Sequence, residues 1–194
     1  MSSPERTPVK KFDDYNVDDR IDARLLENSV FYLSGEINEE TVTACIRWLI
    51  YENLQSTNDK LLTIYINSYG GDLYQAFALI DVIKNSRYTV RTIGIGAVMS
   101  AAFLIFTSGS PGHRIIAKNT SLMCHQFSDE IAGKHHDLKA TLKEAENSNE
   151  KMMEILREAT GLTTARIRAK LLKETDVYLT AHEAVDLNVA DHLL

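Results

Sequence analysis

The sequence predicts an α/β fold in which short strands alternate with helices and pair in parallel. Short runs rich in β-branched and aromatic residues alternate along the chain with segments whose apolar residues recur at helical spacing. Such alternation is typical of βα units around a parallel sheet. The chain has 194 residues, which suits a single domain, and it contains no internal repeat.

The first half of the chain is predicted to contain two strand–helix units. Residues 29–33 form a short strand by composition, and residues 39–55 form a helix because apolar side chains recur every three or four positions. Residues 62–67 form the second strand, which Gly70 and Gly71 close. Asp72 then opens a helix, because an acidic residue in the first turn is favoured by the helix dipole.

The second half continues the alternation and then becomes mainly helical. A strand over residues 88–95 leads into a helix that begins near Ser100, and residues 121–126 form a further strand. A long amphipathic helix covers residues 137–159, and Gly161 is placed to cap it. Two short helices are expected at residues 165–173 and 181–187.

The N-terminal segment, residues 1–20, is predicted to be a flexible arm ahead of one domain at residues 21–194. It contains two of the three prolines and many charges, and it lacks the apolar core of a secretory signal. The longest apolar run in the chain, residues 93–107, is shorter than the roughly 20 residues that a membrane span needs. We therefore expect no membrane contact.

Charge and cysteine usage narrow the functional classes. The net charge is −6, which makes nucleic acid an improbable partner because phosphate binding needs concentrated Lys and Arg. Cys45 and Cys124 lack CxxC spacing and sit in apolar runs, which indicates neither a zinc site nor a disulfide framework. A reducing, cytoplasmic location is the expectation, with no metal and no organic cofactor.

Two strand-to-helix junctions are the first candidate functional sites. At residues 67–72, the glycine pair allows a sharp turn and brings backbone N–H groups close to a ligand, although the residues alone favour a plain turn. At residues 94–102, Ser100 is flanked by small residues at a helix start. A nucleophile is one interpretation, and a serine that merely caps its helix is the other.

A nucleophilic serine needs a base, and His125 is the only histidine within an apolar, strand-like run. A packed core histidine is the alternative for this residue taken alone. Cys124 is an unsuitable partner for His125, because adjacent residues on a strand point to opposite faces. His135 and His136 lie in a charged stretch, which favours a solvated face over a metal site.

Four motifs, in this order, resemble those of the proteolytic subunits of the Clp protease. They are the glycine-rich loop at residues 65–71, the serine segment at residues 96–114, the histidine strand at residues 119–126 and the segment at residues 176–184. The resemblance extends from about Arg24 to Leu194. It implies that Ser100 is the nucleophile of a serine endopeptidase, His125 its general base, and Asp176 the residue that orients His125.

The resemblance also implies how substrate is held. The oxyanion hole would consist of the backbone N–H groups of Gly71 and Ala101, and an extended substrate would pair beside Gly70 and Gly71 as an added strand. Phe127, where the family usually has proline, would lie in the substrate cleft. The family also has Met-Gly after the serine, whereas this chain has Ala101 and Ala102.

The implied fold is a crotonase-like spiral of βα units with a protruding handle helix. The implied assembly is a homo-heptameric ring, or two such rings stacked as a tetradecamer, into which related subunits could mix. An AAA+ unfoldase would hydrolyse ATP and feed unfolded proteins to the chamber through an axial gate formed by residues 1–20. The chain itself lacks the glycine-rich Gly-x-x-x-x-Gly-Lys-Ser/Thr loop that binds ATP phosphates.

Three other functions remain open on the sequence. The chain could be a catalytically weak or regulatory subunit of mixed rings, although such relatives usually lose one of the three residues and this chain keeps Ser100, His125 and Asp176. It could be a crotonase-type acyl-CoA enzyme, which uses a similar two-amide oxyanion hole. It could also be a scaffold on which the three residues have no catalytic role.

Overall fold

The structure is a computed structural model that describes residues 16–55, 59–126 and 134–194. The helices are α1 (Val17–Glu27), α2 (Glu39–Leu54), α3 (Leu73–Lys84), α4 (Ala101–Thr107), α5 (His135–Thr160), α6 (Thr164–Lys170) and α7 (Ala181–Asp186). The strands are β1 (Val30–Ile37), β2 (Leu61–Gly71), β3 (Thr89–Met99), β4 (Arg114–Ile116), β5 (Ser121–Cys124), β6 (Val177–Leu179) and β7 (His192–Leu193). Strands and helices alternate from β1 to α4, as the sequence predicts.

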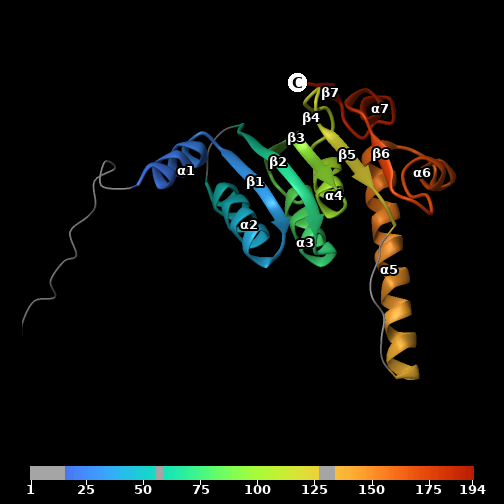
Figure 1. Ribbon diagram of the computed structural model, residues 1–194. Coiled ribbons are helices and arrows are strands. Elements are labelled where there is room, and N and C mark those ends of the chain that lie inside the picture. The colour runs from blue at the N-terminus through green and yellow to red at the C-terminus, as the bar shows by residue number, and fades with distance from the viewer. Residues whose placement is uncertain (1–15, 56–58, 127–133) are drawn as a thin grey trace, which may run out of the picture.

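The described strands form one seven-stranded sheet (Figure 1). Its main path runs β1-β2-β3-β4-β7, and β5 branches from β3 and pairs with β6. β5 and β6 are antiparallel, whereas the other described strand pairs are parallel. The predicted α/β architecture with a mostly parallel sheet is therefore confirmed.

Helices α2 and α3 begin where the sequence places them. The Asn38 side chain accepts a hydrogen bond from the backbone N–H of Thr41, and the Asp72 side chain accepts from those of Tyr74 and Gln75. Helix α4 packs between strands and neighbouring helices with all seven of its residues buried. Because every residue of α4 packs in the core, the position of its first residue, Ala101, is fixed by its surroundings.

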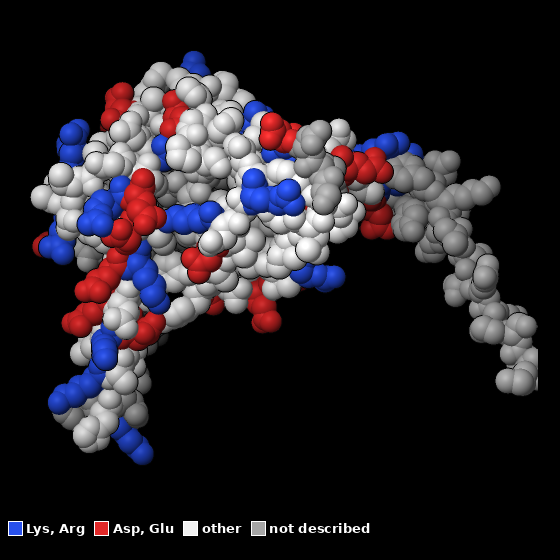
Figure 2. All heavy atoms as spheres, turned by 180° about the vertical axis from the view of Figure 1, so that it is seen from behind, with Lys and Arg blue, Asp and Glu red and all other residues white. Residues whose placement is uncertain are grey.

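Helix α5 is the longest helix described, at 26 residues, and it extends beyond the sheet (Figure 1). Gly161 ends it in the left-handed conformation, with φ 69°, as its position in the sequence predicts. Its C-terminal half contributes Met152, Ile155 and Leu156 to the core. Its outer surface carries side chains of both charges (Figure 2).

Helix α1 differs from the sequence-based expectation, because it includes residues 17–20 of the predicted arm. Asn16 caps it by accepting from the backbone N–H of Asp19, and Val17, Ile21 and Leu25 follow at helical spacing. These signals could have revealed the helix. The remainder of the predicted arm, residues 1–15, lies outside the described residues. Three strands that the sequence did not predict, β4, β6 and β7, are only two or three residues long.

An ion pair between the buried Arg114 and the partly buried Asp191 ties β4 to the C-terminal segment and to α5. The Arg114 Nε and Nη2 atoms donate to the two carboxylate oxygens of Asp191 at 3.0 and 2.5 Å. Its Nη1 donates to the carbonyl oxygen of Ala159 at 2.7 Å. Burial alone would raise the pKa of Asp191, but the hydrogen bonds and charge of Arg114 outweigh burial and hold it below its ordinary value near 3.8.

Asp191→Asn is expected to lower the free energy of unfolding by about 3 kcal/mol at pH 7, because it leaves a buried guanidinium without a counter-charge. The depressed pKa means that this stabilisation is present above about pH 4 and is lost as the pH falls through the folded-state value. Urea unfolding of wild type and variant at pH 7 and at pH 3 measures both effects.

The exposed carboxylate Asp186 supplies the control, and Asp186→Asn should change stability by less than about 0.5 kcal/mol. A difference between wild type and Asp191→Asn that is equally large at both pH values would contradict the ion pair as its source.

Candidate active site

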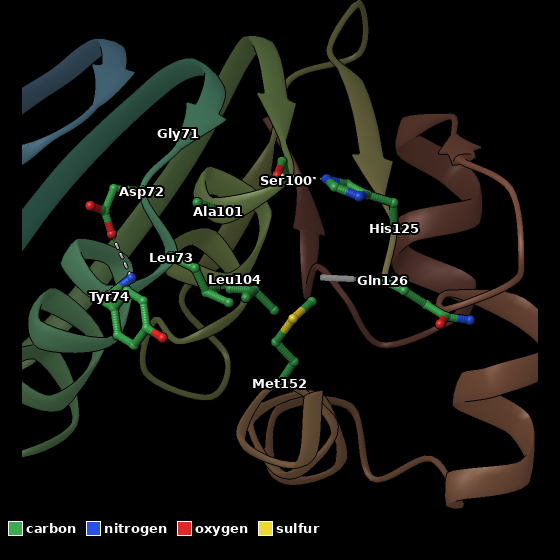
Figure 3. A pocket seen from close by; sticks show the side chains of 10 residues that line it. All are labelled: Gly71, Asp72, Leu73, Tyr74, Ser100, Ala101, Leu104, His125, Gln126 and Met152. Atoms are coloured by element: carbon green, nitrogen blue, oxygen red, sulfur yellow. Dashed lines mark hydrogen bonds between the residues drawn. The ribbon is translucent and has the colours of Figure 1, made fainter. Parts of the chain in front are cut away.

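Ser100 occupies a strained turn between β3 and α4. Its backbone has φ 54° and ψ −123°, a conformation that a non-glycine residue adopts at a cost. Its side chain makes no capping bond to α4. Instead, Ser100 Oγ lies 2.8 Å from Nε2 of His125 (Figure 3). This geometry argues against the helix-capping interpretation and matches the exposed turn used by nucleophilic serines.

A change of partner along β3 brings Ser100 and His125 together. Residues 92–94 of β3 pair with β4, whereas residues 97–99 pair with β5. Met99 stands opposite Met123, and the N–H of Ser100 donates to the Met123 carbonyl at 2.9 Å. His125 comes just after the end of β5, so parallel pairing delivers it next to the serine.

Asn67 supports β3 where the change of partner occurs. Gly96 has φ 62°, and a Cβ there would lie 2.6 Å from Asn67 Oδ1. The same Oδ1 accepts a hydrogen bond from the N–H of Ala97 at 3.1 Å. The sequence drew attention to residues 67–72 for their glycines but missed this role of Asn67, for which an amide beside a glycine-rich turn was the available signal.

The backbone at Gly70 and Gly71 approaches its neighbours more closely than a side chain would allow. A Cβ at Gly70 would lie 2.6 Å from Ser100 Cβ and 2.9 Å from the Met99 carbonyl oxygen. A Cβ at Gly71 would lie 2.3 Å from the Ile37 carbonyl oxygen. Both glycines have positive φ, at 105° and 147°. The turn is therefore fitted against the serine and is more than a plain connection.

A pocket of about 290 Å³ opens beside Ser100 and His125. Leu73, Leu104 and Met152 give it an apolar side, and Met152 points from α5 toward Leu104 (Figure 3). Backbone of Gly71 and Ala101 also lines it. Ala101 is the first residue of α4, so its N–H has no acceptor within the helix. A polar group of a ligand in this pocket could receive that hydrogen bond.

Asp176, the third of the predicted site residues, does not line this pocket. The residue precedes β6 and is exposed. Among the residues that the structure describes, no hydrogen bond joins Asp176 to His125. Of the three residues that the sequence groups together, the structure brings Ser100 and His125 into contact, whereas Asp176 precedes β6, the strand that pairs with β5. Phe127, the other expected cleft residue, lies outside the described residues.

Comparison with known protein families matches residues 14–194 to the model of the Clp protease family. The chain belongs to the Clp protease family. The match includes every helix and strand described above and all of the pocket residues. Membership implies a peptidase of the Clp type in general, and it weighs against an acyl-CoA enzyme.

Cys124 is poorly suited to act as a nucleophile in this Clp protease family member. Burial raises the pKa of its thiol to about 12, and a backbone hydrogen bond at His125 opposes this only in part. Cys45 is also buried, and burial likewise raises its pKa. Both thiols are therefore protonated at neutral pH and behave as small core side chains.

Residues 16–55, 59–126 and 134–194 contain no group of three or more His, Cys, Asp or Glu side chains that could hold a metal ion. No helix in the same ranges combines the length and apolar character needed to cross a membrane.

Gly70→Ala is expected to disrupt the site, because the new Cβ would overlap Ser100 and the Met99 carbonyl. We expect a loss of most serine reactivity and a drop in stability of about 2–3 kcal/mol, measured by fluorophosphonate labelling and by thermal unfolding. Gly35→Ala is the matched control, because Gly35 also has a positive φ of 82° but a Cβ there would meet nothing within 4 Å. Equal effects of the two substitutions would show that backbone conformation alone matters.

Proposed function

We propose that this chain is a serine endopeptidase subunit of a self-compartmentalised, ATP-dependent protease. In this proposal Ser100 is the nucleophile, His125 the general base and Asp176 the residue that orients the base. The observation that carries it is the 2.8 Å contact between Ser100 Oγ and His125 Nε2 at a strained strand-to-helix turn. Membership of the Clp protease family supports the same reaction class.

The chemistry follows from this contact. Ser100 Oγ attacks a peptide carbonyl carbon while its proton moves to Nε2 of His125. The tetrahedral intermediate carries an oxyanion, and the N–H groups of Gly71 and Ala101 would donate to it. The intermediate collapses as His125 returns the proton to the leaving amine. Water then attacks the acyl-enzyme with His125 again as base, which releases the acid and restores Ser100.

Substrate binding would use the edge of the glycine turn and the adjoining pocket. An extended peptide would run beside Gly70 and Gly71. The apolar side of the pocket, formed by Leu73, Leu104 and Met152, supports binding of an apolar substrate side chain. Peptide bonds of unfolded proteins meet both requirements, because folded proteins rarely present extended apolar segments.

Assembly into rings is part of the same proposal. Apolar side chains are exposed on α1 and α2, among them Val17, Ile21, Tyr51 and Leu54, which are between 51% and 76% exposed. An apolar surface of this kind favours contact with other subunits. An AAA+ unfoldase would supply ATP hydrolysis, and residues 1–20 would form the axial gate. A handle role for α5 and a cytoplasmic location complete the proposal.

A second candidate function is that of a catalytically weak or regulatory subunit within mixed rings. The observation that favours it is the exposure of Asp176 and its lack of a hydrogen bond to His125 in the described part of the chain. A base without its orienting carboxylate loses much of its efficiency. Peptidase activity measured for the chain alone and after mixing with a related subunit separates the two candidates.

Treatment with a fluorophosphonate is expected to add one covalent group to the wild-type protein, because His125 activates Ser100. Ser100→Ala should remove the adduct completely, and His125→Ala should slow labelling by about 10³-fold. Intact mass and the time course of labelling provide both measurements. Ser108→Ala, which removes a buried hydroxyl bonded to the Leu104 carbonyl, is the control and should keep the adduct.

A well-folded, ring-sized wild-type sample that gains no adduct would overturn activity of the chain alone. Labelling that survives in Ser100→Ala would place the reactive group elsewhere.

Asp176→Asn tests the orienting role directly. If the carboxylate turns to His125 in the working enzyme, the substitution should slow labelling of Ser100 by about 100-fold with little loss of stability, because Asp176 is exposed. The labelling time course and the unfolding temperature are the measurements. Glu174→Gln, which alters an exposed carboxylate two residues away, is the control. An unchanged rate in Asp176→Asn would favour the weak-subunit candidate.

A further inference from the structure

The segment that carries Asp176 is anchored at both ends and exposed between them. On its N-terminal side, Leu171 and Leu172 are buried in the core. On its C-terminal side, β6 pairs with β5. The intervening residues 173–176 are all exposed. The position of Asp176 therefore depends on how firmly these two ends are held.

The register of β5 and β6 relates the position of Asp176 to that of His125. Leu122 stands opposite Leu179, Met123 opposite Tyr178 and Cys124 opposite Val177. The ladder ends at Cys124 and Val177, and one further step in the same register would set His125 opposite Asp176. Directly opposed residues lie on the same face of a sheet, with Cβ atoms about 4.5–5.5 Å apart. If the backbone of residues 173–176 follows this register, the carboxylate comes within reach of the imidazole.

Gln126, the residue after His125, holds the other end of the segment. Its Nε2 donates to the carbonyl oxygens of Leu172 and Lys173, at 3.2 and 3.1 Å. An amide nitrogen has two N–H donors, so both are used here. The side chain points away from Ser100 (Figure 3). These bonds connect residues that are 46 and 47 positions apart in the chain.

The geometry points to Gln126 as a positioning residue for Asp176, an inference that rests on the proposed function. Gln126 fixes the carbonyl groups at one end of residues 173–176, while the β6 ladder fixes the other end. Without this tether, the exposed segment has more conformations in which Asp176 does not face His125. The fraction of molecules competent for catalysis then falls, and the rate falls with it.

Two substitutions separate the donor function from the size of the side chain. Gln126→Ala removes the amide, and Gln126→Glu keeps its length but replaces both donors by a carboxylate that cannot donate at neutral pH. Each is expected to slow fluorophosphonate labelling of Ser100 by about tenfold. The reason is that each removes two neutral hydrogen bonds, whose effect on Ser100 passes through the position of Asp176. In an Asp176→Asn background, neither should slow labelling further.

Hydrogen exchange of the peptide that covers residues 173–179 supplies a readout independent of activity. Both Gln126 variants are expected to exchange faster there than the wild type, with the rest of the chain unchanged. Gln75→Ala is the matched control, because the Gln75 side chain lies on α3 and makes no hydrogen bond among the described residues. It should leave both exchange and labelling as in the wild type.

Unchanged exchange in the Gln126 variants would overturn the tether. A tenfold slowing that persists in the Asp176→Asn background would overturn the route through Asp176. If the wild type does not label at all but the Gln126 variants exchange faster, the tether stands, and the peptidase proposal is the one that fails.

Discussion

The site depends on one constraint. Strand β3 pairs first with β4 and then, over its last residues, with β5. The change of partner occurs at Gly96, which has a positive φ. Beside it, Asn67 Oδ1 accepts a hydrogen bond from the backbone N–H of Ala97. Because β5 then runs parallel to the last residues of β3, Ser100 and His125 come out at the same edge of the sheet. An ordinary straight strand would have kept the two residues apart.

Strain at Ser100 is maintained by its surroundings. The residue lies between a strand that pairs on both sides and a helix whose seven residues are all buried, so neither neighbour can relax toward a commoner backbone conformation. Gly70 packs against the same turn from β2. Strained backbone of this kind persists only where the fold over-determines it, and it holds the serine hydroxyl away from the capping position that would otherwise use it.

The sequence predicted the larger elements well and the smallest ones not at all. Helix α2, the opening of α3 at Asp72 and the cap of α5 at Gly161 carry local signals that outweigh tertiary effects. Strands β4, β6 and β7 have two or three residues each, too few for any periodicity, and they exist because neighbouring strands supply hydrogen-bond partners. Helix α1 was missed because its charges and its nearness to the prolines resembled an arm, although its cap at Asn16 is a local signal.

The sequence by itself determined the fold class, the two glycine-containing junctions and the chemical types available there. Those properties depend on residue identity and short-range spacing. Only the tertiary structure decided that Ser100 contacts His125 and does not cap α4, that Asp176 is exposed, and that Gln126 bonds to the carbonyl groups of residues 172 and 173. These outcomes depend on strand register and on contacts between residues up to 47 positions apart, which no local pattern in the chain encodes.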